Sequence, residues 1–168
     1  MIFEDEASFR QDPSLYQTWS PRGEQPRIPT TGQRNTQKIF GAVALQQPRF
    51  HFRQDTVFNG QTYAQFLEQL AGCYPRQRVI LIHDNVAYHR APEVRRWLSQ
   101  HRRFEVAALP AYSPEFNAVE PVWHHTRLQA THNRYYPETQ QFIASLTGTL
   151  RNIARHPNQI AGYLHPFL

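Results

Sequence analysis

Three carboxylates stand in segments that the sequence assigns to different secondary-structure elements. Asp5 lies in FEDEASF, Asp84 directly follows the apolar run RVILI, and Glu120 lies in SPEFNAVEPVW. Carboxylates from two strands and a helix, without a set of cysteines, are ligands for hard cations such as Mg²⁺ and Mn²⁺. Two such ions ~4 Å apart stabilise both the attacking and the leaving oxygen of an in-line phosphoryl displacement. If the three side chains converge, we expect metal-dependent phosphoryl-transfer chemistry.

Each of these acids also has a purely structural interpretation. Asp84 followed by Asn85 is good turn chemistry, and Asp5 fits a charged edge strand that discourages aggregation. Asn117 and Glu120 have the spacing of a capping pair, with Asn117 as N-cap and Glu120 at the third helical position. A carboxylate in a first helical turn is also stabilised as the anion by the helix dipole, and a metal ligand has to stay ionised.

The elements that must position these acids follow from the hydrophobic pattern. RVILI is a continuous apolar run, typical of a strand buried on both faces, and FEVAAL is expected to be a second central strand. Asn59-Gly60 is a turn signal after the third β-rich segment. Strands are expected at 2–6, 15–19, 38–45, 49–58, 78–82 and 104–109, and helical spacing occurs over 63–74, 91–98, 117–128 and 142–153. This order predicts a single α/β domain whose mixed sheet has an antiparallel edge and a parallel centre.

Composition restricts the classes of protein to consider. The 168 residues are 40% hydrophobic and 18% charged, which suits one globular domain with a core. Cys73 is the single cysteine, so an internal disulfide is excluded, and we expect it to be a small core residue. The acidic N-terminal segment is no signal peptide, and no stretch approaches the ~20 apolar residues of a membrane span. We therefore expect a cytoplasmic protein without a membrane partner.

The charge favours a polyanionic partner, although a basic solvated surface explains it equally well. The net charge is +5, and nearly all of the basic residues are arginines, which suit bidentate phosphate contacts. One group follows Asp84 closely in the sequence and is a candidate DNA-binding surface. Its members are Arg90, Arg95, Arg96, Arg102 and Arg103.

The three acidic segments together resemble a known family. FEDEASF, VILIHDNVAYH and LPAYSPEFNAVEPVW, in this order, are similar to the DDE transposases of the mariner-like superfamily, most closely to the bacterial insertion-sequence branch. WSPRG at 19–23 is also similar to the family's second-strand segment, so the resemblance covers nearly the whole chain. It implies a ribonuclease H-like sheet, with three antiparallel strands followed by two parallel ones.

The resemblance also implies roles for individual residues. Asp5, Asp84 and Glu120 match the catalytic triad, which would hold two Mg²⁺ or Mn²⁺ ions. Asn85 would shape the turn after the second acid, whereas His89 would either support the metal ligands or face DNA. Asn117 belongs to the same group of residues around the site. The implied activity is phosphodiester hydrolysis at transposon ends, followed by strand transfer into target DNA.

The chain departs from the family pattern in two respects. Ala118 stands where the family commonly has proline, and Pro121 follows Glu120 instead, which fits a helix only if it starts late. We also expect the family's N-terminal helix-turn-helix region to be absent from this chain, and a separately encoded protein could supply it. The expected partners are then transposon ends, target DNA, further copies of the chain in a dimer or larger assembly, and this DNA-reading protein.

Three alternatives stay open to different degrees. A non-catalytic DNA-binding remnant would keep the fold and the charge, and another ribonuclease H-like nuclease would keep the metal chemistry. A zinc hydrolase could use His83, His124 and His125. It is disfavoured because no His-Glu-x-x-His motif occurs and because adjacent helical histidines point to different sides.

Overall fold

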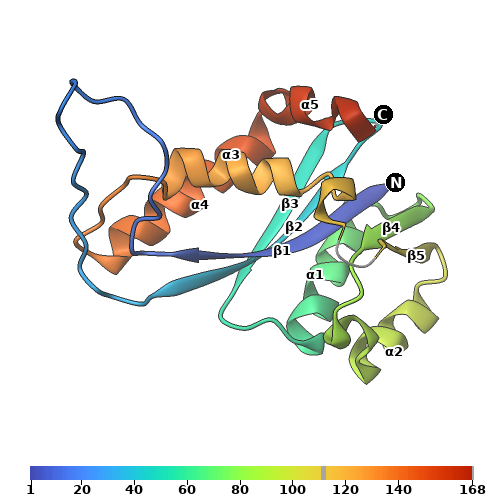
Figure 1. Cartoon of the computed structure of the whole chain (residues 1–168). Coiled ribbons are helices and arrows are strands. Elements are labelled where there is room, and N and C mark those ends of the chain that lie inside the picture. Colours follow the sequence, from blue (N-terminus) through green and yellow to red (C-terminus); the bar gives the residue numbers. More distant parts are fainter. Residues whose placement is uncertain (111–112, 168) are drawn as a thin grey trace.

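The computed structural model describes residues 1–110 and 113–167, which form a five-stranded sheet with helices on both faces (Figure 1). The sheet has the strand order β3-β2-β1-β4-β5. Its strands are β1 (Ile2–Arg10), β2 (Thr36–Ala44), β3 (Arg49–Asp55), β4 (Val79–His83) and β5 (Phe104–Ala108). The α-helices are α1 (Gly60–Cys73), α2 (Pro92–Gln100), α3 (Glu120–Ala130), α4 (Thr139–Arg155) and α5 (Asn158–Leu164), with short 3₁₀ helices η1 (Ala87–Arg90), η2 (Pro114–Phe116) and η3 (His165–Phe167).

The strand directions agree with the predicted mixed sheet. β1 pairs antiparallel with β2, and β2 pairs antiparallel with β3. On the other side of β1, the pairings β1–β4 and β4–β5 are parallel. The predicted order of three antiparallel and then two parallel strands is therefore confirmed.

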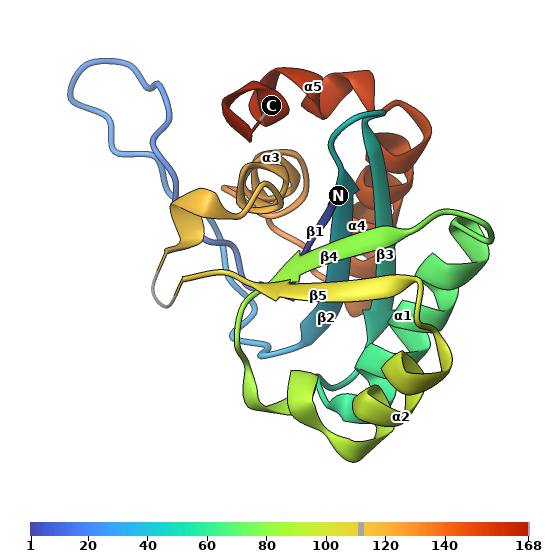
Figure 2. The same ribbon diagram turned by 90° about the vertical axis from the view of Figure 1, so that its right-hand side faces the viewer.

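Helices α1 and α2 lie on one side of the sheet and α3 and α5 on the other (Figure 2). Side-chain alternation along the strands therefore divides the core into two layers. On the α3/α4 face, Phe3 and Phe9 of β1 pack with Trp123 of α3 and with the apolar stripe of α4 and α5. On the α1/α2 face, Ile2 of β1 and Leu81 of β4 pack against α1 and α2. A strand at the centre of the sheet can thus present functional side chains to either layer.

Three strand predictions are wrong. Residues 15–19 are irregular and exposed, with Trp19 99% accessible, because no neighbouring strand pairs with them. The RVILI segment is not buried on both faces: Ile80 of β4 is 40% exposed on the side where no helix covers it. FEVAAL forms β5, which is an edge strand of the described sheet and not a central one.

Two local predictions are also corrected. Asn59 does not close a strand turn; it is the N-cap of α1. Its side chain accepts a hydrogen bond from the Thr62 amide, and the Thr62 hydroxyl accepts one from the Asn59 amide. Cys73, expected in the core, is exposed at the last position of α1. Within the described ranges, no helix combines the length and the apolarity that crossing a membrane requires.

Candidate active site

The acidic run Glu4-Asp5-Glu6 in β1 serves both faces of the sheet. Because strand side chains alternate, Asp5 points toward α3, whereas Glu4 and Glu6 point toward α1 and α2. The contacts agree with this division: Asp5 meets Trp123 of α3, and Glu6 meets His89 of η1. Sequence reasoning assigned no role to Glu4 or Glu6.

Trp123 fixes the position of the Asp5 carboxylate. Its indole Nε1 donates a hydrogen bond to Asp5 Oδ2 at 2.8 Å, and the ring is fully buried between Phe9 and Phe50. Gly41 of β2 is paired with Asp5 and leaves the room that the indole occupies. A Cβ atom at Gly41 would lie 2.3 Å from the Trp123 ring, so a larger residue there would displace the group that holds Asp5.

Asp5 and Glu120 form a pair of like charges. Burial, and then the nearby Glu120 carboxylate, raise the pKa of Asp5 to about 7, although the Trp123 hydrogen bond opposes the shift. Among the ion pairs of residues 1–110 and 113–167, none joins Asp5 or Glu120 to a cationic side chain. A cation placed between these two carboxylates would therefore relieve both the repulsion and the cost of burial.

The start of α3 brings Glu120 to this position, but not by the predicted capping pair. The helix begins at Glu120 itself with Val119 as its N-cap, so Asn117 is not the N-cap and Glu120 is not at the third position. The buried Asn117 side chain instead donates to the Glu4 carbonyl at 3.2 Å and accepts from the Val119 amide at 3.1 Å. These bonds tie the helix start to β1. Pro121 falls in the first turn, where its missing amide costs nothing.

Asp84 lies just beyond the carboxyl end of β4, as predicted. The parallel register pairs Phe3 with Ile82, and continuing it by two residues would bring Asp84 level with Asp5. The Asp84 side chain is 51% exposed and accepts from the Val86 amide at 3.2 Å, which is the turn chemistry noted in the sequence. Burial, and then the Glu6 carboxylate, raise the pKa of Asp84.

The structure brings two of the three predicted acids together and holds the third by other contacts. The Glu120 charge contributes to the raised pKa of Asp5, whereas Asp84 lies close to His89 and its pKa is raised in part by Glu6. In the part of the chain that the structure describes, two groups of potential metal ligands have atoms within 4.8 Å of one another, and the set of Asp5, Asp84 and Glu120 is not among them. The groups are Glu6-Asp84-His89 and Glu4-His83-His89.

His89 connects the Asp84 loop to β1. Its Nδ1 lies 3.1 Å from the Asp84 carbonyl oxygen, and its Nε2 lies 2.8 Å from Glu6 Oε1. The Tyr88 hydroxyl donates to the same Glu6 oxygen. Burial, and then the charge of Glu6, raise the pKa of Tyr88, which therefore remains a donor. His89 is buried, and its side chain supports the loop from inside.

The deepest part of this face holds Glu4 and Tyr63, which sequence reasoning missed, beside His83, which was considered only as a ligand of a disfavoured zinc hydrolase. Glu4 is fully buried, and its pKa is raised by burial first and then by the Glu6 and Asp5 carboxylates. The Tyr63 hydroxyl lies near enough to oppose this shift but outside hydrogen-bonding geometry. Burial, and then the neighbouring His89, lower the pKa of His83 to about 3. Strand alternation placed Glu4 on this face, but nothing local in the sequence indicated which residues meet it.

The predicted DNA-binding arginines divide into two kinds. Arg90 and Arg95 are exposed and line a cavity of about 210 Å³ that also reaches Asp84 and Asn85. Arg96 and Arg102 are exposed as well. Arg103 differs, because its guanidinium donates to the carbonyl oxygens of Ala71 and Tyr74 and thereby satisfies the end of α1.

Comparisons with known proteins show the family of the chain. A family model described as "DDE superfamily endonuclease" matches residues 1–143. The "Insertion element IS630 uncharacterized 39 kDa protein" of Shigella sonnei is 26% identical over 158 residues, which cover 94% of this chain and 46% of that protein. The chain thus spans about half the length of this relative.

Solved structures show the same fold. The "Mos1 transposase paired-end complex with left transposon end" has a TM-score of 0.63 at 17% identity, covering 98% of this chain and 54% of that chain. The "mariner Mos1 paired end complex with Mg" has a TM-score of 0.64 at 18% identity, covering 98% and 53%. The ribonuclease H-like fold and the resemblance to mariner-like transposases are therefore confirmed.

Proposed function

We propose that this chain, which belongs to the DDE superfamily endonuclease family, is the single catalytic domain of a metal-dependent DNA transposase. It would hydrolyse a phosphodiester at a transposon end and then join the freed 3′-hydroxyl to target DNA. One observation carries the proposal above all. Asp5 and Glu120 form a half-buried pair of carboxylates with no cationic partner among the described residues, next to the strand end that bears Asp84.

The donor set fits hard divalent ions. Asp5, Asp84 and Glu120 offer only carboxylate oxygens, which Mg²⁺ and Mn²⁺ prefer, and we propose that they hold two such ions. The ions would supply Lewis-acid stabilisation of the attacking and leaving oxygens, and the same in-line displacement serves both hydrolysis and strand transfer. The raised pKa of Asp5 in the metal-free protein supports this assignment, because a bound cation would remove its cause.

Neighbouring residues position the acids. Trp123 orients Asp5 through its indole N–H, and Asn117 ties the start of α3, with Glu120, to β1. His89 is a positioning residue, since it links the backbone of Asp84 to Glu6 on β1. Asn85 lines the cavity beside Asp84, where we propose that it shapes the turn.

DNA is the proposed substrate and partner. The net charge of +5 and the exposed residues Arg90, Arg95, Arg96 and Arg102 supply a surface for phosphates. The Mos1 structure was solved with a transposon end, and by analogy we propose that copies of this chain act as a dimer or larger assembly on DNA. A separately encoded helix-turn-helix protein is a further proposed partner.

A cleavage assay tests the proposal. The chain is incubated with DNA carrying the element's end and, where needed, a supplied end-binding partner, in Mg²⁺, Mn²⁺, Ca²⁺ or chelator. Mg²⁺ and Mn²⁺ should give a nick with a 3′-hydroxyl and then joined products, whereas Ca²⁺, which is larger and looser in its coordination, should support binding only. Binding without cleavage in every metal would indicate a non-catalytic remnant. Cleavage without joining would indicate another ribonuclease H-like nuclease.

A further inference from the structure

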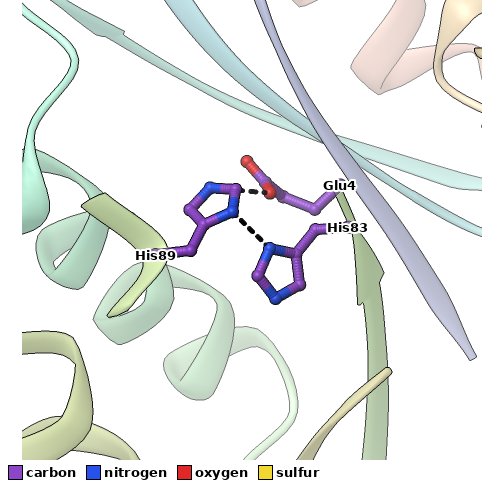
Figure 3. A group of neighbouring side chains, drawn as sticks. All are labelled: Glu4, His83 and His89. Atoms are coloured by element: carbon purple, nitrogen blue, oxygen red, sulfur yellow. Dashed lines mark hydrogen bonds and ion pairs between the residues drawn. The ribbon is translucent and has the colours of Figure 1, made fainter. Parts of the chain in front are cut away.

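A cluster of possible metal ligands lies on the sheet face opposite Asp5. Glu4 of β1, His83 of β4 and His89 of η1 are all buried, and one ligand atom from each lies within 4.8 Å of the other two. The three side chains point toward one another from separate elements (Figure 3). They therefore form a compact cluster with two imidazoles and one carboxylate.

This cluster leaves polar atoms unsatisfied. In the described part of the chain, both Glu4 oxygens and His83 Nε2 are buried without a hydrogen-bond partner. An isolated buried carboxylate is costly unless it is neutralised or bonded to a cation. In addition, Nδ1 of His83 and Nδ1 of His89 are 2.5 Å apart. Two ring nitrogens cannot both direct lone pairs at each other at this distance, so either a proton or a cation must lie between them.

The outer contacts of His89 match those of a metal ligand. A ligating histidine usually donates its second ring N–H to a carboxylate, which orients the ring and makes it a better donor. Here the second nitrogen, Nε2, lies 2.8 Å from Glu6 Oε1. The remaining contact of Nδ1, with the Asp84 carbonyl at 3.1 Å, is the one that a bound ion would replace.

We propose that Glu4, His83 and His89 bind one transition-metal ion of the Zn²⁺ class, separate from the Mg²⁺ or Mn²⁺ at the acidic triad. Two imidazole nitrogens with one carboxylate favour Zn²⁺, Co²⁺ or Ni²⁺ over Mg²⁺. Tetrahedral binding would part the two nitrogens to about 3.3 Å, a small rotation of the rings. The cavity of about 210 Å³ that both histidines line provides a path to the site.

The ion would act structurally. It would join β1, β4 and η1 at one point, directly behind the loop that carries Asp84. It would also neutralise Glu4, which strand alternation forces into the α1/α2 core. The site does not depend on the proposed transposase activity, and its test requires no DNA.

Cobalt binding tests the site directly. The full chain is titrated with Co²⁺ in millimolar Mg²⁺ while visible d–d absorption is recorded. We expect one equivalent with the intense bands of a four-coordinate site. Glu4→Gln and His83→Gln should each abolish the bands, and Glu6→Gln should weaken binding about 10–100-fold through His89. Asp5→Asn should keep them, as should the matched control His101→Asn, which removes another histidine near a carboxylate, Glu68.

Several outcomes would overturn the proposal. The absence of a d–d absorption band from the wild-type chain at one equivalent of Co²⁺ would contradict the proposal, and this measurement requires no substitution. Bands that persist in a folded Glu4→Gln variant would also contradict it. Bands that disappear in Asp84→Asn and Glu6→Gln but persist in Glu4→Gln and His83→Gln would place the ion at Glu6-Asp84-His89. If a shared proton occupies the histidine pair, Zn²⁺ should not raise the melting temperature, and Glu4→Gln should be as stable as wild type.

Discussion

The acidic side chains on the two faces of the central sheet have different kinds of neighbours. On the α3/α4 face, Asp5 is held by a neutral indole donor and lies against a second carboxylate, Glu120. On the α1/α2 face, Glu6 meets His89 and Tyr88, and Glu4 lies beside the same histidine. One run of three acids in a single strand, alternating in direction, supplies both environments.

This difference supports the proposal that one strand separates two kinds of cation site. The Asp5 face presents only oxygen atoms and leaves negative charge uncompensated by the described residues, which suits a hard ion exchanged with substrate. The Glu4 face mixes nitrogen with oxygen and is closed off by α1 and α2, which suits a resident, structural ion. Asp84 lies between the two faces, because it directly follows β4 and its backbone carbonyl contacts His89.

The largest effect should come from removing the charge of Asp84. Asp84→Asn keeps the shape of the side chain and the turn bond to the Val86 amide but removes a proposed metal ligand. Because bound metal supplies several kcal/mol of transition-state stabilisation, cleavage of end DNA should fall by roughly 10³-fold or more. DNA binding should be unchanged or slightly tighter, because a negative charge is removed. Single-turnover cleavage and gel-shift titration measure the two quantities.

Glu115→Gln is the matched control for this variant. Glu115 is an exposed acid on η2, near Glu120 in sequence but outside the proposed metal site. Its replacement should leave cleavage within about twofold, as expected for a surface change. If Asp84→Asn retained full activity, the proposed triad would not be catalytic and the division between the two faces would lose its functional meaning.

The next effect concerns the stability of the metal-free protein against pH. The folded-state pKa of Asp5 is raised to about 7, so the fold retains a proton that the unfolded chain has released. The resulting loss of folding stability is absent below about pH 4, grows as the pH rises, and is complete above about pH 7. Asp5→Asn should therefore stabilise the metal-free protein at pH 8 by an order of a few kcal/mol, but not at pH 4.

Urea denaturation at pH 4, 6 and 8, with and without Mg²⁺, measures this effect. Mg²⁺ should raise the stability of wild type at pH 8 and have little influence on Asp5→Asn. Asp12→Asn provides the control, because Asp12 is an acid at the surface that bonds only to Thr30 among its described contacts. Equal pH dependence of the stability of wild type and Asp5→Asn would show that burial and Glu120 do not raise the pKa of Asp5.

A smaller effect is expected from the packing that holds Asp5. In Gly41→Ala, the new methyl group would meet the Trp123 ring at 2.3 Å, so the indole must shift. Overpacking should cost about 1–3 kcal/mol, and displacement of Asp5 should reduce cleavage by up to about 10²-fold. The control is Gly72→Ala in α1, where a Cβ meets nothing within 4 Å. That variant should gain about 0.5–1 kcal/mol and cleave normally. Normal cleavage by Gly41→Ala would show that Trp123 does not position Asp5.

Sequence reasoning predicted the parts of this site that depend on local pattern. The apolar run before Asp84 identified the end of a parallel strand, and the helical spacing over 117–128 identified the helix that carries Glu120. The bond between Trp123 and Asp5 could not be predicted, because it depends on Gly41, a residue of a third element that leaves space for the indole.

The wrong strand predictions share one physical cause. Residues 15–19 have a strand-like composition but no partner strand, and FEVAAL has a partner on one side only. Burial of Ile80 would require a helix over β4 on the α3/α4 face, and α3 covers β1 instead. Glu4 and His89 meet only because β1 and the loop after β4 are adjacent in space. Pairing and coverage are tertiary properties, and a single sequence carries little local signal for them.

The smallest effect should come from the exposed arginines, whose expected contribution to DNA affinity does not depend on which metal sites the two faces hold. Replacing Arg90, Arg95 and Arg96 by alanine should lower the slope of log affinity against log salt by roughly one unit for each phosphate that is no longer bound. The control triple replaces Arg76, Arg151 and Arg155, which carry the same charge elsewhere on the surface. Fluorescence anisotropy over a salt series distinguishes local phosphate binding from a general field, because equal slopes in the two triples would leave net charge as the only contribution. Arg103→Ala should instead lower the melting temperature with little change in slope, since its guanidinium holds the end of α1.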